Sequence, residues 1–351
     1  MDIHKKYMKR CLELAQKGFG RVSPNPMVGC VIVYHDKIIG EGYHQKFGEA
    51  HAEVNAINSV KMQNIASLRD ATIYVNLEPC SHFGKTSPCT NLIINSGIKY
   101  IVIGNIDTNP IVKGKGIQQL LQAGCDVKIG IMDDECKEIN KRFFTFHEKK
   151  RPYILLKYAQ TQDGFMANGK CRIQISGDSA IKLVHQWRSE EQSIIVGTNT
   201  ALIDNPELTV RKIKGKNPIR IVLDREKKIP LSFHLLDGSV PTIIFTAKKK
   251  SASKNIDYIT IDFRKDVLKQ IMNELYKRQI QSLIVEGGAK ILNSFLQKNL
   301  WDEARVFTNK KTLLEITGTK INGIKSPGIK AQKFSREKIG NDELEIYRHF
   351  T

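Results

Sequence analysis

The sequence predicts an α/β protein of two domains, each built around a mainly parallel sheet with helices on its faces. A length of 351 residues is long for one domain. In both halves, apolar runs of strand length alternate with stretches of helical periodicity. A charged stretch that ends at a proline, Thr145 to Tyr153, is typical of an interdomain linker and suggests domains at 1–147 and 152–351.

In the N-terminal half the predicted strands are short apolar runs bounded by turn residues. They cover residues 28–33, 37–44, 71–77, 99–105 and 125–131. Apolar residues at helical spacing predict helices over 51–60, 89–97 and 116–124. Gly97 and Gly124 close the last two of these helices, and residues 34–36 form a turn between the first two strands.

The C-terminal half repeats the alternation. Strands are predicted at 153–159, 193–197, 219–224, 242–246 and 282–288. Helices are predicted at 178–192, 266–279 and 289–299. Because strands that alternate with helices form parallel sheets, both halves are expected to share this architecture.

The net charge is strongly positive, at +19, while aromatic residues make up only 7% of the chain. Such a charge suits nucleic acid or phosphorylated small ligands, and it also serves solubility. The Lys and Arg residues are scattered and the aromatics are few, which disfavours a base-stacking surface.

The cysteines and the N-terminus indicate the compartment. No run of eighteen apolar residues occurs and the N-terminus lacks an apolar signal core, so we expect a cytoplasmic protein without a membrane partner. Seven cysteines lie between Cys11 and Cys171. Reduced thiols or metal ligands are therefore expected in preference to a disulfide framework.

The stretches "EAHAE" (49–53) and "PCSHFGKTSPC" (79–89) contain the residue types that bind zinc in proteins. A catalytic zinc takes three protein ligands and a water, and His51, Cys80 and Cys89 supply the preferred donors. Each is expected where a helix begins, where the helix dipole favours the thiolate. Glu53, two residues beyond His51, is placed to shuttle protons without becoming a ligand.

Ordinary core residues are the alternative interpretation of these four positions, but the combination is rare. His-Ala-Glu, followed by Glu-Pro-Cys and a second Cys, matches the zinc deaminase signature H-x-E…P-C-x-x-C. Eight residues separate Cys80 from Cys89, however, where the signature has two. We therefore predict one zinc per chain, with an unusual insert between two of its ligands.

The motifs "SPNPMVGCVIV", "GYHQKFGEAHAE", "NLEPCSHFGKTSPC" and "GNIDTNPIVKGKG" resemble the deaminase domain of the bifunctional riboflavin-biosynthesis deaminase/reductase family. The long Cys-to-Cys insert is characteristic of that family. The resemblance implies a cytidine-deaminase-like three-layer fold. It also implies hydrolytic removal of an amine from a diaminopyrimidine that carries a ribosylamino 5′-phosphate, with Glu53 moving the protons.

Three further residues are candidate substrate contacts in this domain. Asn25 lies in the Pro-flanked loop "SPNPMVG" and either hydrogen-bonds the substrate or only forms a turn. His82 and Lys85 lie in the insert between the two Cys ligands. That insert either closes over a phosphate-bearing substrate or is a plain solvent loop.

In the second half, "YILLKYAQTQDGFMA", "HQWRSEEQSIIVGTNTALIDNPELTVR", "NPIRIVLDR" and "LIVEGGAKIL" resemble the family's reductase domain. The resemblance implies a dihydrofolate-reductase-like fold and an NADPH cofactor. That fold binds NADPH without a G-x-G-x-x-G loop, and no such loop follows a strand here.

The resemblance to the reductase domain also implies roles for individual residues. Those expected at the cofactor are Lys157, Gln160, Gln174, Thr200, Asp204, Arg225, Gly287 and Gly288. Those expected at the substrate are Arg172, Arg188, Leu208, Arg211 and Glu286. Forked guanidinium donors suit a phosphate, and paired glycines let backbone amides approach one.

Each assignment has a structural alternative. Arg188 on an amphipathic helix is otherwise a solvated residue, and Asp204 before Asn-Pro is otherwise a turn cap. Arg225 is the candidate for the 2′-phosphate that distinguishes NADPH from NADH, or else an ordinary surface residue. For Glu286 the functional interpretation is stronger than for the other residues, because a carboxylate at the end of an apolar strand needs a charged or hydrogen-bonding partner.

One segment departs from the family pattern. The family usually shows Ser-x-Trp before Ile-Ser/Thr-Gly, whereas this chain reads "RIQISG", with Arg172 and Gln174 at those positions. Two alternatives stand beside the bifunctional enzyme, the first supported by this departure and the second by the net charge of +19. One is a deaminase with an inactive reductase-like module, and the other is a nucleic-acid deaminase with a basic accessory domain.

The interpretation that accounts for the most motifs is a bifunctional riboflavin-pathway enzyme with zinc and NADPH as cofactors. Its partner is expected to be a phosphorylated pyrimidine, with no nucleic acid and no membrane, and the oligomeric state is left open.

Overall fold

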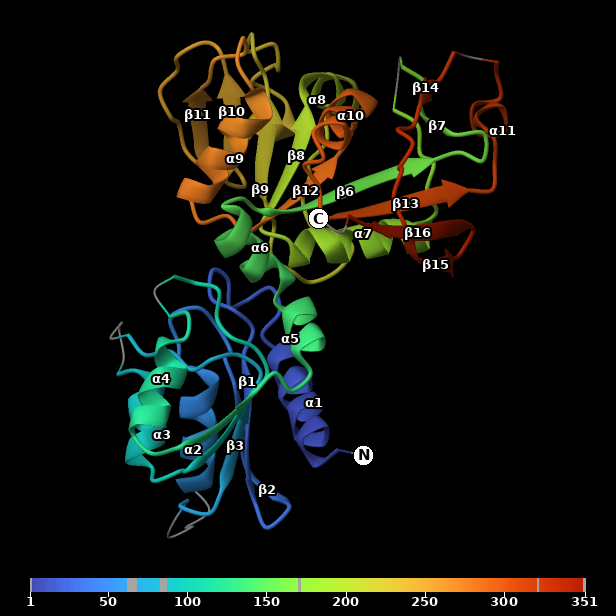
Figure 1. Ribbon diagram of the computed structural model, residues 1–351. Coiled ribbons are helices and arrows are strands. Elements are labelled where there is room, and N and C mark those ends of the chain that lie inside the picture. The colour runs from blue at the N-terminus through green and yellow to red at the C-terminus, as the bar shows by residue number, and fades with distance from the viewer. Residues whose placement is uncertain are drawn as a thin grey trace. The chain divides into compact units, whose positions relative to one another are not determined.

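The computed structural model describes residues 2–61, 68–82, 87–110, 112–169, 172–320 and 322–349. The chain divides into two compact units, Met1–Lys150 and Arg151–Thr351, each with its own sheet (Figure 1). Among the described residues, no helix has both the length and the apolar character needed to cross a membrane.

The N-terminal unit is built on a five-stranded sheet of order β2-β1-β3-β4-β5. Its strands are β1 (Gly29–Tyr34), β2 (Lys37–Tyr43), β3 (Thr72–Val75), β4 (Tyr100–Ile103) and β5 (Asp126–Ile129). β1 runs antiparallel to β2 and β3, whereas β3, β4 and β5 are parallel.

Helices cover both faces of this sheet, so the unit has three layers (Figure 1). One face carries α2 (Ala52–Lys61), α3 (Cys89–Asn95) and α4 (Lys115–Gln122); the other carries α1 (Ile3–Gln16) and α5 (Asp133–Ile139). Side chains of β1 alternate between the two cores: Ile32 packs into the first, and Val31 and Val33 into the second. This arrangement confirms the three-layer prediction.

The boundary between the two units falls inside the predicted linker, after Lys150, but the first part of that linker is a helix. Helix α6 (Lys141–Lys149) runs through it, and Thr145 and Phe146 are buried. The helix ends where Lys150 takes a left-handed conformation, with φ of 54°. The error arose because charged residues from 148 onward concealed the apolar spacing of Phe143 and Phe146.

The C-terminal unit is built on a nine-stranded sheet of order β11-β10-β9-β8-β12-β6-β13-β16-β15. Its strands are β6 (Tyr153–Gln160), β8 (Ser193–Gly197), β9 (Ile219–Leu223), β10 (Thr242–Thr246), β11 (Ile256–Thr260), β12 (Ser282–Glu286), β13 (Glu303–Asn309), β15 (Lys333–Ile339) and β16 (Asp342–Arg348). A separate pair joins β7 (Phe165–Ala167) to β14 (Ile324–Lys325).

The helices of this unit are α7 (Asp178–Glu190), α8 (Thr198–Asp204), α9 (Val267–Lys277), α10 (Ala289–Gln297) and α11 (Leu313–Thr317), with a short 3-10 turn, η1 (His234–Leu236). Along β6, Ile154 and Leu156 pack into one core and Leu155 into the other, so both faces of the sheet are covered. The strands from β11 to β13 are parallel, and β16 and β15 complete the sheet in antiparallel sense. The carboxyl ends of the parallel strands therefore share one edge, where open α/β sheets place their ligands.

Candidate functional sites

The metal-ligand candidates of the N-terminal unit converge. His51 Nδ1 lies 3.5 Å from Cys80 Sγ and 3.3 Å from Cys89 Sγ. The three donor atoms all lie within 4.8 Å of one another. Cys89 is buried, whereas His51 and Cys80 are half-buried, so a ligand can reach the trio from one side.

Local structure explains why these residues meet. His51 directly precedes α2, and its carbonyl accepts from Asn55 N (3.1 Å). Cys89 is the first residue of α3. Cys80, by contrast, lies in the non-helical stretch 79–82, so the prediction that a helix begins there is wrong among the described residues. Cys89 N still donates to Cys80 Sγ (3.4 Å), which gives this sulfur the amide contact that a helix start would provide.

A glycine lets α2 come close enough to hold His51 at the site. A Cβ on Gly42 of β2 would lie 2.4 Å from both Ala52 O and Ala56 N. Only a residue without a side chain allows the first turn of α2 to pack this tightly on the strand.

The trio fits a zinc ion by its chemistry and its spacing. A tetrahedral zinc with bonds of about 2.0–2.3 Å needs neighbouring donors roughly 3.5 Å apart. Both nitrogen–sulfur distances are close to this value. Hydrogen bonds from Cys89 and His51 lower the pKa of the Cys80 thiol to about 4, so Cys80 favours the thiolate that a metal requires, whereas the contact with Cys80 and burial raise the pKa of the Cys89 thiol.

Glu53 is buried on the first turn of α2, beside the trio. Burial raises the pKa of its carboxyl, as does the negative charge of Cys80, while His51 acts in the opposite direction. The group thus sits next to the ligand candidates without belonging to their set. A raised carboxyl pKa suits a group that must both accept and return a proton.

Of the three predicted substrate contacts in this unit, Asn25 has the clearest environment. Its Nδ2 lies 3.1 Å from His44 Nε2, and the His44 ring packs edge-on against His51 at 5.4 Å. His44 Nδ1 lies 3.0 Å from Ala50 O, and burial lowers the pKa of this imidazole. His82 is exposed beyond Cys80, and Lys85 lies outside the described residues.

His44 and Glu78 are the residues that sequence reasoning missed. Both stand inside the quoted motifs, at "GYHQ" and "EPC", so the signal was present. The Glu78 carboxylate accepts from the amides of Asp107 (3.2 Å), Gly114 (2.9 Å) and Gly116 (2.9 Å). It thereby fastens the loop that precedes α4 to the segment that carries Cys80.

In the C-terminal unit, the strongest cluster joins Lys157, Arg188 and Glu286. Glu286 ends β12, and its neighbour in the register of β6 is Lys157. Lys157 Nζ lies 3.2 Å from Glu286 Oε1, and Arg188 of α7 donates through Nε to Oε2 (3.1 Å) and again through a second nitrogen. Burial would raise the pKa of Glu286, but the charges of Arg188 and then Lys157 outweigh it and hold it at about 2.

One oxygen of this carboxylate has fewer partners than the other. Glu286 is 8% exposed, and among the described residues the partner of its buried Oε1 is the Lys157 ammonium, 3.2 Å away. A buried charged oxygen of this kind needs a further donor, and a ligand hydroxyl or amine at the strand end would supply one.

Gly287 and Gly288 follow Glu286 and form a cradle with Thr200 of α8. Their φ angles are 120° and 31°. A Cβ on Gly287 would lie 2.9 Å from Thr200 Cγ2, and one on Gly288 would lie 3.0 Å from Thr200 Oγ1. Backbone alone fits here, as at a site where a phosphate meets amide groups.

The segment 205–211, which carries Leu208 and Arg211, is held from several sides. Arg188 Nη1 donates to Thr209 O (3.3 Å), and Arg211 N donates to His185 Nδ1 (3.1 Å). Leu208 has φ of 54°, and its side chain is buried in the core. Any contact of Leu208 with substrate must therefore use its main chain. The Arg211 guanidinium pairs with Glu207 (2.5 Å) at the surface.

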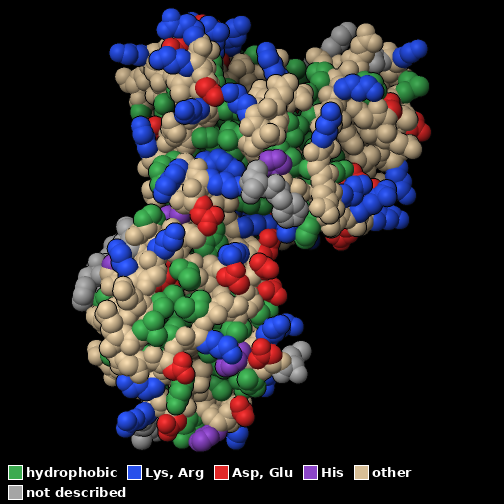
Figure 2. Space-filling model, viewed as in Figure 1, with side chains coloured by type: hydrophobic (Ala, Val, Ile, Leu, Met, Phe, Trp, Pro, Cys, Tyr) green, Lys and Arg blue, Asp and Glu red, His purple; other side chains and the backbone are tan. Residues whose placement is uncertain are grey.

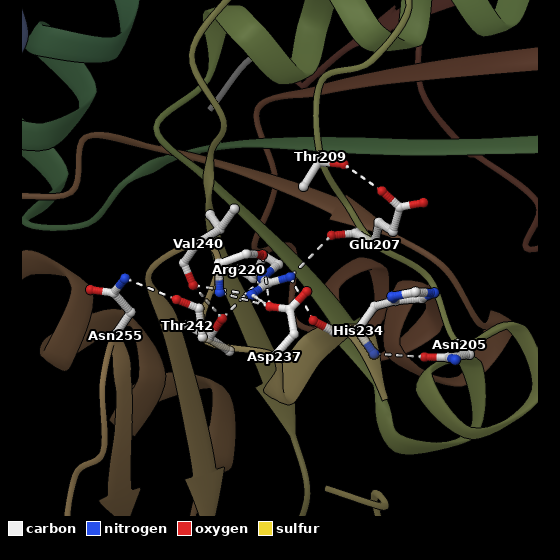
Figure 3. A network of polar contacts seen from close by, with 11 residues as sticks. Asn205, Glu207, Thr209, Arg220, His234, Asp237, Val240, Thr242 and Asn255 are labelled. Carbon is white, nitrogen blue, oxygen red and sulfur yellow. Dashed lines mark hydrogen bonds and ion pairs between the residues drawn. The ribbon is translucent and has the colours of Figure 1, made fainter. Parts of the chain in front are cut away.

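Arg220 of β9 contacts the segment 205–211 at Glu207 and lies in a network of polar contacts (Figure 3). It is fully buried and donates to oxygens of Thr242 (2.9 Å), His234 (2.7 Å), Val240 (3.1 Å), Asp237 (2.9 Å) and, at 3.5 Å, Glu207. Burial raises the pKa of Asp237, but hydrogen bonds from Arg220 and Ser239 bring it down to about 2.

We expect Arg220→Met to lower the free energy of unfolding by about 3–5 kcal/mol, because it strips donors from several buried oxygens and breaks a charge pair. Urea unfolding measures the loss. The control is Arg264→Met, which removes an 87% exposed side chain paired with Asp262 and should leave the free energy of unfolding nearly unchanged. Equal losses in the two variants would contradict the anchoring role.

The remaining predicted contacts lie around the same sheet edge without forming one cluster. Gln160 donates to Thr308 Oγ1 (3.0 Å) and accepts from Ser326 Oγ (2.5 Å). Exposed Gln174 lines a cavity with Asn309 and Lys310. Asp204 ends α8; burial raises the pKa of its carboxyl, and the charge of Arg172 opposes this. Arg225 follows β9 and is 60% exposed.

Family models match both units. Residues 1–105 match the cytidine and deoxycytidylate deaminase zinc-binding region, and residues 152–342 match the RibD C-terminal domain. Fold and site thus define a two-part enzyme, with a zinc-type deaminase unit followed by a reductase unit of dihydrofolate-reductase-like fold.

Relatives match over the full length. The riboflavin biosynthesis protein RibD of Aquifex aeolicus is 40% identical, with 99% of each chain covered, and that of Escherichia coli is 36% identical, with 88% of each covered. A crystal structure of the Thermotoga maritima diaminohydroxyphosphoribosylaminopyrimidine deaminase/5-amino-6-(5-phosphoribosylamino)uracil reductase superposes with a TM-score of 0.89. It is 36% identical and covers 99% of this chain and 98% of its own. The chain belongs to the RibD family of bifunctional deaminase/reductases of riboflavin biosynthesis.

Proposed function

We propose that the N-terminal unit hydrolytically deaminates a diaminopyrimidine that carries a ribosylamino 5′-phosphate. We further propose that the C-terminal unit then reduces the ribosyl group to ribityl with NADPH. The observation that carries the first step is the convergence of His51, Cys80 and Cys89 beside buried Glu53. The match with the Thermotoga maritima enzyme supports the choice of substrate.

In the deaminase site, His51, Cys80 and Cys89 would hold zinc. A zinc ion bound there would act as a Lewis acid that makes water ionise near neutral pH. Glu53 passes the proton of the attacking water to the ring nitrogen and then passes the proton of the newly added hydroxyl to the departing amine, because ammonia leaves only when protonated. Asn25, whose amide contacts His44, orients the pyrimidine in this proposal.

In the reductase site, NADPH would supply the hydride. The Gly287–Gly288 cradle lets backbone amides approach the cofactor's pyrophosphate. Lys157 and Arg188 fix the Glu286 carboxylate. This carboxylate accepts a hydrogen bond from the substrate. Arg211 has the forked donors that a substrate phosphate requires, and Arg172 adds positive charge near Asp204.

Metal content tests the ligand set. Protein purified without added metal should contain about one zinc per chain. Cys80→Ser should lose this zinc, because serine is a poor ligand at neutral pH. Cys125→Ser is the matched control, since Cys125 is a free, buried cysteine outside the trio, and it should keep the zinc. Full zinc content in Cys80→Ser would remove Cys80 from the ligand set.

A further inference from the structure

The two cysteines proposed as zinc ligands lie far apart along the chain for a deaminase site. In the signature P-C-x-x-C the cysteines are three positions apart, and this spacing places both sulfur atoms on one face of a single helical turn. Here eight residues separate Cys80 from Cys89, and residues 83–86 lie outside the described part of the chain. The geometry of this pair therefore depends on contacts with other elements.

The first of these contacts join the two cysteine segments directly. Cys89 N donates to Cys80 Sγ (3.4 Å), and Thr90 N donates to Cys80 O (3.2 Å). Thr90 is fully buried, and its hydroxyl lies closer to Gln119 Oε1 (2.7 Å) than to Cys80 O (3.3 Å). The amide of Thr90 thus serves Cys80, while its hydroxyl donates to a side chain of α4.

Gln119 of α4 uses both ends of its amide toward the start of α3. Its Oε1 accepts from the Thr90 hydroxyl, and its Nε2 donates to Asn91 Oδ1 (2.6 Å). Thr90 and Asn91 directly follow Cys89, the first residue of α3. Because the acceptor and the donor of this amide are both engaged, the start of α3 is held against α4 in one orientation.

Glu78 joins the other cysteine segment to the same helix. Gly114 precedes α4 and has no side chain to cap it. The amides of Gly114 and Gly116 instead donate to the Glu78 carboxylate (both 2.9 Å), which is buried two residues before Cys80. A Cβ on Gly116 would lie 2.2 Å from Pro79 O, so α4 begins in direct contact with this segment.

We propose that Thr90 and Gln119 are positioning residues of the zinc site. Together with Glu78, they fix the two cysteine ligands to α4, and so to each other, across the insert. The inference rests on the proposed deaminase function, because it takes the two cysteines as ligands. In this role α4 replaces the short connection of the P-C-x-x-C signature. Partners of this kind, which orient metal ligands without touching the metal, typically contribute about 10–100-fold in metal affinity.

Gln119→Leu should raise the dissociation constant of zinc about tenfold or more, because it removes both hydrogen bonds to α3 at a similar side-chain size. Gln118→Leu is the matched control, since it makes the same change at the preceding, exposed position of α4, and it should leave the zinc affinity unchanged. The surface tolerates such a leucine. Leu121 of the same helix is already 53% exposed, and Figure 2 shows other hydrophobic side chains exposed on the N-terminal unit.

A second pair of variants tests the other end of the same hydrogen bond. Thr90→Val removes the hydroxyl at nearly constant volume and should weaken zinc binding about tenfold, whereas Thr90→Ser keeps the hydroxyl and should bind zinc nearly as the unaltered protein does. Because Thr90 and Gln119 share this bond, the double variant Thr90→Val/Gln119→Leu should bind zinc about as weakly as Gln119→Leu alone.

Two measurements on the full chain decide the assignment: the dissociation constant of zinc, by competition with a coloured chelator, and the visible spectrum of cobalt bound in place of zinc. Gln119→Leu and Thr90→Val should shift the cobalt bands, because the thiolate ligands change their arrangement, and Gln118→Leu and Thr90→Ser should not. If Gln119→Leu does not fold, the comparison of Thr90→Val with Thr90→Ser decides.

Equal zinc affinities and identical cobalt spectra in Gln119→Leu and Gln118→Leu would overturn the assignment. A lower free energy of unfolding of metal-free Gln119→Leu, with normal zinc affinity, would also overturn it, because the contact would then only stabilise the fold. Either result, with zinc bound by the unaltered protein, leaves the ligand set intact. If the unaltered protein binds no zinc, the deaminase proposal falls together with this inference.

Discussion

Glu53→Gln is expected to lose deamination by roughly two to four orders of magnitude while the protein keeps its zinc. That range is the usual contribution of a positioned acid/base group. The amide is nearly the same size as the carboxyl and cannot take up the proton of the attacking water. Zinc stays because the ligand set of His51, Cys80 and Cys89 does not include Glu53. Ammonia release and metal analysis on the same preparation measure both quantities.

The same variant separates the two activities. Because the reductase candidates all belong to the unit Arg151–Thr351, Glu53→Gln should still oxidise NADPH when the deaminated intermediate is supplied directly. Loss of both activities in a folded, zinc-loaded Glu53→Gln protein would mean that Glu53 is structural, or that one composite site performs both steps.

Glu286→Gln is expected to lower the reductase activity strongly and to leave the deaminase activity unchanged. The substitution leaves Lys157 and Arg188 buried without their counter-charge, which costs about 2–5 kcal/mol. If about 3 kcal/mol of this is lost from the transition state, kcat/KM for reduction falls roughly a hundredfold. NADPH oxidation with the deaminated intermediate measures the loss, and ammonia release from the first substrate should be unchanged.

Stability provides an independent readout for Glu286. Its pKa is depressed from 4.5 to about 2, so the ionised form stabilises the fold above the unfolded value and the contribution disappears as the pH falls toward 2. The glutamine variant lacks this pH dependence. Glu274→Gln, which alters a surface pair with Arg278, is the control and should change neither reduction nor acid stability. A Glu286→Gln protein with unaltered reduction would remove this carboxylate from the site.

The deaminase site could be predicted almost entirely from the sequence, because its chemistry is local. His51 and Glu53 are two residues apart, and Cys80 and Cys89 occupy one short segment, so spacing alone carries the signal. Their convergence required only that the starts of α2 and α3 come together beside the irregular stretch that carries Cys80. His44 was missed because its link to Asn25 and His51 depends on packing that spacing does not reveal.

The reductase cluster could not be derived in the same way. Lys157 and Glu286 are distant in sequence and meet because β6 and β12 pair in one register, and Arg188 reaches them from a helix. Sequence patterns identify the strands but not their order. The burial of Leu208 could not be predicted either, since it depends on the left-handed conformation of this residue in a loop held by other parts of the fold.

Charged residues, and the lack of an apolar alternation, explain why one helix and one strand were not predicted from the sequence. The positive run beyond Phe146 suggested a linker where α6 continues. Strand β15, "KFSREKI", was not predicted because it is a nearly fully exposed edge strand and lacks the apolar alternation of a half-buried one.

One chain is expected to perform two successive reactions at two separate sites. To test this, the diaminopyrimidine substrate is supplied to the purified protein, with and without NADPH, and the products are identified by mass. Without NADPH, the product should carry the mass change of an amino group replaced by oxygen and retain its ribosyl group. With NADPH, the same molecule should gain one further pair of hydrogens. Reduction before deamination, or no deamination by zinc-loaded protein, would contradict the account.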